Sequence, residues 1–226
     1  MKLYRYQPIN KFTLESLLLK QNWASNPKYF NDPFEFLIPD RYKVDDKGEV
    51  KFLTHQEGSI RQSILESIIK FGVISYSSKY DNILLWSHYS AMHTGICIEF
   101  EIDETEIQNL FQVNYEKGLP DLEFNADSDI INVLTTKGEY WNYENEYRQI
   151  FSKGDKYYKQ PGAITEIIFG CRTSNNDIDA LLKLFDNNYE IDILFSKMSI
   201  QPNTYFLSKG TPHRKRNETI PKFWVR

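Results

Sequence analysis

The sequence predicts an α+β protein with a central mixed or mostly antiparallel sheet and flanking helices. Alternating apolar residues, as at 96–102, are typical of half-buried strands. Apolar residues at helical spacing, as at 55–70 and 82–93, indicate amphipathic helices. Strands and helices do not alternate strictly, which favours a mixed sheet over a doubly wound one. A length of 226 residues suits one domain, so we expect a single domain over residues 1–226.

The individual elements follow from the same patterns. Expected strands lie at residues 3–6, 73–77, 96–102, 111–115, 143–151 and 164–170, with extended structure at 189–207. Expected helices lie at residues 13–21, 55–70, 82–93, 127–137 and 177–187. Thr13 is expected to cap the first helix, and Gly72 and Gly95 to end the second and third. We expect an ordered loop at 22–40 and a turn at 45–49.

Composition narrows the class of protein. A net charge of −4 lacks the excess of basic residues that is typical of nucleic-acid-binding domains. The one basic cluster, 213–216, lies in a short C-terminal tail near 211–226 and is interpreted as solvated. Cys97 and Cys171 sit in apolar runs, which predicts reduced core residues. The polar N-terminus and the lack of a long apolar run predict a cytoplasmic protein with no membrane partner.

Three segments are rich in polar and aromatic residues. The first is Phe-Asn-Asp-Pro-Phe-Glu at 30–35. Asn and Asp before a proline form turns through side-chain bonds to their own backbone. The segment is therefore either a structural turn pinned by its phenylalanines or a rigid loop that offers Asn31 and Asp32 to a ligand.

The second segment combines Ser75–Ser78 with Trp-Ser-His-Tyr at 86–89. A strand followed by a helix can place Ser77 and the polar face of the helix at one cleft edge. His88 is either a general acid or base, since its ordinary pKa is near neutrality, or a hydrogen-bonded packing residue. His88 and His93 lack the i, i+4 spacing of a helical zinc pair, so we expect no metal site.

The third segment covers residues 140–148. As a strand, it places Glu144, Glu146 and Arg148 on one face and its aromatic residues on the other. As a helix, it would pair Glu144 with Arg148. The aromatic alternation favours the strand. The two carboxylates are then either neutralised by Arg148 or available to a sugar hydroxyl.

These segments together resemble a widespread bacterial family of domains of unknown function. The resemblance spans residues 3–170. It rests on Leu-Tyr-Arg-Tyr at 3–6, the segments at 30–35 and 86–89 with Gly95, Trp-x-Tyr-Glu-x-Glu-Tyr-Arg at 141–148, and Glu-Ile-Ile-Phe-Gly at 166–170. The family itself implies no activity.

The order of residues also resembles that of ADP-ribosyltransferases, including the type that modifies DNA. Those folds place a basic residue on an N-terminal strand, a serine segment in mid-chain and a glutamate on a later strand. The resemblance implies such a fold, NAD as substrate, and Arg5, Ser77 and Glu146 as catalytic residues, with Glu166 a rival acid. It implies substrate contacts from Tyr6, Asn31, Asp32, Trp86, His88, Tyr89, Glu144, Arg148 and Glu166.

We therefore expect an enzyme that transfers ADP-ribose from NAD to a nucleic-acid or protein acceptor, in a toxin or phage-defence context. Breaking the nicotinamide–ribose bond builds positive charge on the sugar, which Glu146 would stabilise while Arg5 paired with the pyrophosphate. The alternative is a non-catalytic nucleotide- or protein-binding module of bacterial defence or signalling, with Glu144, Glu146 and Arg148 in a closed salt-bridge network. A third hypothesis is a hydrolase or nuclease that uses His88 with Asp32 or Glu35.

Overall fold

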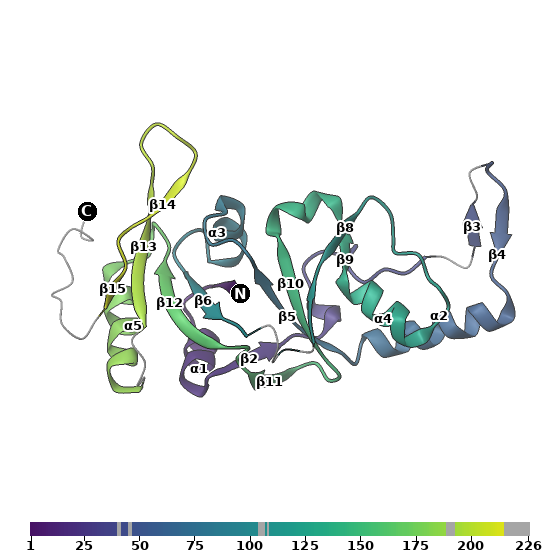
Figure 1. The fold of residues 1–226 in the computed structure, drawn as a ribbon, viewed down its shortest axis with the longest axis horizontal. Helices are drawn as coiled ribbons and strands as arrows, with labels where there is room; N and C mark the ends of the chain where they lie inside the picture. Colours follow the sequence, from purple (N-terminus) through teal and green to yellow (C-terminus); the bar gives the residue numbers. More distant parts are fainter. Residues whose placement is uncertain (40–41, 45–46, 104–106, 108, 189–192, 215–226) are drawn as a thin grey trace. The chain divides into compact units, whose positions relative to one another are not determined.

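The computed structural model is an α+β fold, as expected (Figure 1). It describes residues 1–39, 42–44, 47–103, 107, 109–188 and 193–214. The chain forms two compact units. Unit 1 comprises residues 1–22, 76–108 and 159–226, and unit 2 comprises residues 23–75 and 109–158. The single-domain organisation remains a prediction.

Unit 1 is built on a sheet in the order β14-β13-β12-β6-β1, with the end of β5 beside β1. Its elements are β1 (Lys2–Gln7), α1 (Lys11–Leu19), α3 (Ile83–Tyr89), β6 (Ile96–Glu101), β12 (Ala163–Phe169), α5 (Asn175–Asn188), β13 (Leu194–Ile200), β14 (Leu207–Lys209) and β15 (His213–Arg214). The pairs β1–β5, β1–β6, β6–β12 and β13–β14 are antiparallel, whereas β12 and β13 are parallel. The sheet is therefore mixed and mostly antiparallel.

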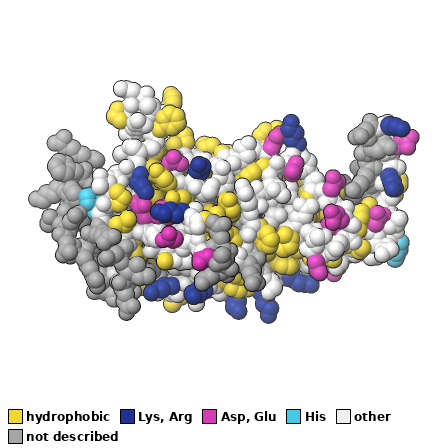
Figure 2. All heavy atoms as spheres, viewed as in Figure 1, with side chains coloured by type: hydrophobic (Ala, Val, Ile, Leu, Met, Phe, Trp, Pro, Cys, Tyr) yellow, Lys and Arg dark blue, Asp and Glu magenta, His cyan; other side chains and the backbone are white. Residues whose placement is uncertain are grey.

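The two faces of this sheet differ in chemistry. One face carries aromatic rings that pack against α5: Phe169 stacks with Phe195, which in turn contacts Phe185 of α5. The other face carries α3, whose Trp86 meets the ring of Tyr6 edge to face at 5.2 Å. The hairpin of β13 and β14 ends in exposed apolar side chains, visible in Figure 2 as hydrophobic atoms at its tip. These are Ile200, Tyr205 and Phe206.

Three strands are divided between the units: β2 (Gln21–Ala24), β5 (Gly72–Ser77) and β11 (Lys156–Lys159). Unit 2 further contains the 3₁₀ helices η1 (Pro27–Tyr29) and η2 (Glu139–Glu144), the helices α2 (His55–Ile68) and α4 (Ala126–Thr135), and the strands β3 (Tyr42–Val44), β4 (Val50–Phe52), β7 (Leu110–Gln112), β8 (Asn114–Glu116), β9 (Thr136–Gly138) and β10 (Glu146–Phe151). Its strands β5, β10 and β7 lie side by side. The apolar core joins α2 and α4 to this sheet through Ile64, Ile68, Val73, Val133 and Ile150.

Most expected elements are present, with several corrections. Gly72 begins β5 and does not end α2, whose C-cap is Ile69. The loop expected at 22–40 contains most of β2. Asn10, not Thr13, caps α1, because the Asn10 side chain accepts a hydrogen bond from the Thr13 backbone. The helix expected at 82–93 ends at Tyr89, since residues 91–93 have positive φ angles. The segment 140–148 is not one strand. Residues 139–144 form η2, and the left-handed Asn145, at φ 46°, separates it from β10.

The predictions for the cysteines, for the C-terminal tail and for membrane spans can also be compared with the structure. Cys97 and Cys171 are both free thiols, and Cys97 is fully buried, but Cys171 is only half-buried because it follows β12 rather than lying within it. Residues 213–214 of the expected tail pair with β13, and residues 215–226 lie outside the described residues. No helix in the described part of the chain is long and apolar enough to cross a membrane.

Candidate functional site

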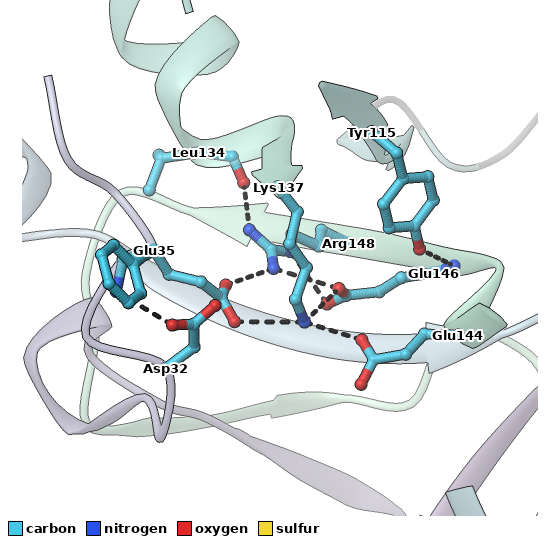
Figure 3. Close-up of polar contacts among 9 residues, drawn as sticks. Asp32, Glu35, Tyr115, Leu134, Lys137, Glu144, Glu146 and Arg148 are labelled. Atoms are coloured by element: carbon cyan, nitrogen blue, oxygen red, sulfur yellow. Dashed lines mark hydrogen bonds and ion pairs between the residues drawn. The ribbon is translucent and has the colours of Figure 1, made fainter. Parts of the chain in front are cut away.

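A buried cluster of five charged side chains lies in unit 2 (Figure 3). Its members are Glu35, Lys137, Glu144, Glu146 and Arg148. Every one of these side chains is at most 5% exposed. Because burying an unpaired ion is costly, such a cluster must satisfy its charges internally.

Local structure brings these residues together from four segments. Glu146 and Arg148 are two apart on β10 and so project from the same face. Glu144 ends η2, and the left-handed Asn145 turns the chain so that Glu144 also faces the cluster. Lys137 comes from the short strand β9, and Glu35 from the Phe-Asn-Asp-Pro-Phe-Glu loop.

Arg148 uses all of its guanidinium nitrogens. Nε and Nη2 donate to the two carboxylate oxygens of Glu146, at 2.8 and 3.0 Å, in a bidentate pair. Nη1 donates to the Leu134 carbonyl at 2.9 Å, and Nη2 also donates to Glu35. The rings of Phe30 and Phe36 lie 5.7 and 5.1 Å from the guanidinium carbon. Each nitrogen of the guanidinium therefore bonds to a protein group.

Lys137 joins the three carboxylates. Its Nζ lies 2.6 Å from Glu144, 3.2 Å from Glu146 and 3.1 Å from Glu35. Trp141 adds a cation–π contact, with Nζ 4.8 Å from its ring centre. The sequence interpretation missed Lys137, because it lies at the end of a segment expected to be helical and its partners are remote in the chain.

The electrostatics follow from this pairing. Burial alone would raise the pKa of Glu146, but Arg148 and Lys137 outweigh burial and hold that pKa at about 2. Burial alone would lower the pKa of Lys137, but the carboxylates of Glu146, Glu35 and Glu144 raise it. Glu146, Lys137 and Arg148 are thus ionised near neutral pH. The cluster sets three carboxyl groups against two cations.

Glu146 has two further contacts, and the one with Ser75 bears on function. Ser75, on β5, hydrogen-bonds its carboxylate and helps to lower its pKa. The Glu146 backbone amide donates to the Tyr115 hydroxyl at 2.9 Å. Ser75 belongs to the serine segment singled out in the sequence, although Ser77 was the residue named from it. The structure therefore brings that segment and Glu146 together through Ser75.

The loop at residues 29–37, which carries Glu35, is held by hydrogen bonds and ring packing on one side and exposes its side chains on the other. Asp32 organises its turn by accepting from the Phe34 amide at 2.9 Å and, through its backbone oxygen, from the Glu35 amide at 3.2 Å. Phe30 and Phe36 pack edge to face at 5.0 Å beneath it. Tyr29 and Phe34 are 66% and 74% exposed. Asn31 is exposed and Asp32 half-buried.

The predicted site residues of unit 1 divide between the two sheet faces. Tyr4 pairs with Ser77 across β1 and β5, so Ser77 lies on the face of Tyr4 and Tyr6. Arg5 lies on the opposite face, and its burial lowers its pKa. The structure therefore does not place Arg5 beside Ser77, because neighbouring residues of one strand point to opposite faces.

Glu166 lies on the face of Ser77. Its strand neighbour is Glu99, and a bulge between Ile164 and Glu166 lets Thr165 donate to Glu99 at 2.7 Å. Glu166 accepts from Ser196 and, at 2.7 Å, from Lys209. Glu99 also accepts from Lys2 and Tyr4. Sequence reasoning missed Glu99, although it lies in a clear alternating strand.

The residues expected around α3 serve mainly packing. Trp86 is fully buried and donates to the Tyr80 carbonyl at 2.7 Å, while the Tyr6 hydroxyl donates to the Lys79 carbonyl at 2.8 Å. His88 is exposed and Tyr89 half-buried, with ring centres 6.2 Å apart.

Two hollows in unit 1 were candidates for a ligand site. One of about 110 Å³ is lined by Lys20, Lys159, Gln160, Gly162, Ala163, Ile164 and Ile193. The other, of about 520 Å³, is lined by Met1, Glu101, Ile102 and Asp103. No predicted site residue lines either hollow.

Over the described residues, no group of three or more His, Cys, Asp and Glu side chains is arranged to hold a metal ion.

Comparisons with known proteins assign neither a family nor a function to this chain. No protein-family model matches the sequence, and neither a curated protein nor a solved structure gives a significant match.

Proposed function

We propose that the protein is a non-catalytic binding module that engages a protein partner through the loop at residues 29–37. The observation that supports this most strongly is the closure of the buried cluster. The carboxylates of Glu144 and Glu146 are already bonded to Lys137 and Arg148, so little of either remains for a substrate hydroxyl. The closed network is the arrangement expected of the binding module.

The loop itself has the properties of a protein contact. Glu35 ties it to Arg148, and the rings of Phe30 and Phe36 pack on the same cation. A fixed loop loses little conformational entropy when it binds. It displays Tyr29, Phe34 and Leu37, which are 66%, 74% and 42% exposed. Exposed aromatic side chains on a rigid support are typical binding hot spots.

A matched set of variants tests the loop. The double variant Tyr29→Ser/Phe34→Ser removes the exposed rings, and Phe52→Ser removes a ring of similar exposure, 72%, from β4. We expect affinity capture from the native cell extract to retain a partner with the wild type and with Phe52→Ser, and to lose it with the double variant. Equal retention by all three proteins, at equal melting temperatures, would refute the loop as the contact.

A second candidate function is ADP-ribose transfer from NAD. Two observations favour it: Ser75 bonds Glu146, and the cluster contains three carboxyl groups but only two cations. Excess negative charge would stabilise the cationic sugar that forms when the nicotinamide bond breaks. In this candidate, Glu146 would release Lys137 or Arg148 when NAD binds.

Nicotinamide release separates the two functions. The protein is incubated with NAD, with and without DNA and protein acceptors, and free nicotinamide is measured by chromatography. The binding module predicts no release above the rate of a heat-inactivated sample. Release by the wild type that is abolished in Glu146→Gln, with the folded state retained, would overturn the module and establish the transferase.

A further inference from the structure

Two turns of unit 1 meet at the end of β12. The first, Ala91–Met92–His93, follows α3 and has φ angles of 49°, 55° and 69°. Left-handed backbone is unfavourable for residues other than glycine, and three such residues in succession are unusual. The second turn runs from Gly170 to Thr173 and leads into α5.

The turns are locked together by backbone contacts. The Arg172 amide donates to the His93 carbonyl at 3.0 Å, and the Gly170 amide donates to the Gly95 carbonyl at 3.0 Å. A Cβ atom at Gly170 would lie 2.1 Å from the His93 carbonyl oxygen, so only glycine fits there. The strained backbone is thus held in place by the second turn.

Four chemically active side chains belong to these turns and to β13: His93, Cys171, Arg172 and Lys197. Lys197 is half-buried and donates to the Thr173 carbonyl at 3.0 Å. Arg172 is exposed, and no acidic partner of it is found among the described residues. The buried Nδ1 atom of His93 has no hydrogen-bond partner within the described part of the chain. A buried polar atom without a partner calls for an explanation, such as a water or a ligand.

The pKa shifts of these groups reflect their burial and their electrostatic interactions with one another. Burial lowers the pKa of His93, and the charge of Arg172 lowers it further. Burial lowers the pKa of Lys197, and burial raises the pKa of the Cys171 thiol against the opposing charges of Arg172 and Lys197. The Asp177 carboxylate accepts a hydrogen bond from the Ser174 hydroxyl at 2.6 Å. The Arg172 and Lys197 cations both act on the Cys171 thiol, and neither has an acidic partner among the described residues.

We propose that His93, Arg172 and Lys197 bind a phosphate group beside the Cys171 thiol. A phosphate oxyanion would supply the negative charge that the two cations lack, and its oxygens suit the planar fork of Arg172. It would also give Nδ1 of His93 an acceptor. This site is independent of the proposed protein-binding loop, because all its residues belong to unit 1.

The two cysteines allow a direct test. Cys97 is fully buried, so an uncharged alkylating reagent such as iodoacetamide reports on the half-buried Cys171 in the folded protein. Inorganic phosphate is titrated at constant ionic strength, and peptide mass spectrometry gives the alkylation rate at each cysteine. We expect phosphate to slow alkylation of Cys171 at least threefold and saturably, while acetate leaves the rate unchanged. A rate independent of phosphate, or equal slowing by acetate, would overturn the proposal.

Variants assign the effect to the cations. Arg172→Gln alters an exposed side chain, so the fold should persist, and we expect it to weaken phosphate protection at least fivefold. Lys197→Gln should act in the same direction. Lys183→Gln removes a matched exposed cation from the middle of α5 and should leave protection unchanged. As a second readout, phosphate should raise the melting temperature of the wild type and Lys183→Gln but not of Arg172→Gln. Equal shifts in all three proteins would contradict the assignment.

Discussion

Arg148 shows how one buried residue organises its surroundings. Its guanidinium bonds Glu146 and Glu35 and the Leu134 carbonyl while two phenylalanine rings pack against it. A buried ion pair adds little net stability compared with an apolar replacement, because desolvation offsets attraction. Removing one partner is different, since it leaves the other charge buried and unpaired.

We therefore predict that Arg148→Ala lowers the free energy of unfolding by about 3–5 kcal/mol, because Glu146 and Glu35 lose their main cation. Urea denaturation followed by circular dichroism measures the change. Lys11→Ala is the control, as it breaks an exposed pair with Glu15 at 3.6 Å and should cost about 0–1 kcal/mol. A cost near 1 kcal/mol for both variants would mean that the cluster is open to water.

At the scale of elements, patterns within the chain predicted most strands and helices, while the site depended on partners remote in sequence. The strand β6 follows from alternating apolar residues, and α2 from its helical spacing. The break between η2 and β10 was missed, because the aromatic alternation of residues 140–148 imitates a strand. Only tertiary contacts with Lys137 and Glu35 fix where the charged side chains point.

Sequence patterns also do not predict where two backbone segments come into close contact. Gly170→Ala would drive a methyl group against the His93 carbonyl, so we predict a loss of at least about 1–3 kcal/mol, as for other overpacked sites. Gly138→Ala, at a position with open space, serves as its control. Melting temperatures of the two variants compare them. An unchanged melting temperature in Gly170→Ala would show that the two turns separate easily.

Helix α2 offers a stabilising change. Gly58 lies in its first turns, where an added methyl group would have nothing within 4 Å, and Thr54 with Glu57 already forms a capping box. Alanine restricts the unfolded chain and favours helix, so Gly58→Ala should raise the free energy of unfolding by about 0.5–1 kcal/mol. Thermal unfolding measures the gain, and a lower melting temperature would contradict an intact helix at this position.

For the whole molecule, each unit contains a buried acid held in its ionised form. Glu146 in unit 2 has a pKa of about 2, because Arg148 and Lys137 outweigh its burial. In unit 1, burial would raise the pKa of Glu99, but hydrogen bonds from Lys2, Thr165 and Tyr4 lower it. Both units therefore depend on ionised carboxylates.

Because both folded pKa values lie below those of the unfolded chain, their stabilisation is complete above about pH 5 and is lost as the pH falls. For Glu146 the loss between about pH 4.5 and 2 is on the order of 3 kcal/mol. We expect the free energy of unfolding to decline over this range in urea titrations. The decline should be shallower in Glu146→Gln, and an equal slope in the variant would contradict the assigned pairing.

The contact between Glu35 and Arg148 joins residues 113 positions apart. On a ribosome that adds about 5–20 residues per second, Glu35 is made roughly 6–23 seconds before its partner. Throughout that interval the newly made loop lacks the Arg148 guanidinium that holds it in the folded protein. Products of premature termination before Arg148 should thus carry the aromatic residues at 29–37 unanchored, and such fragments should be ready substrates for cellular proteases.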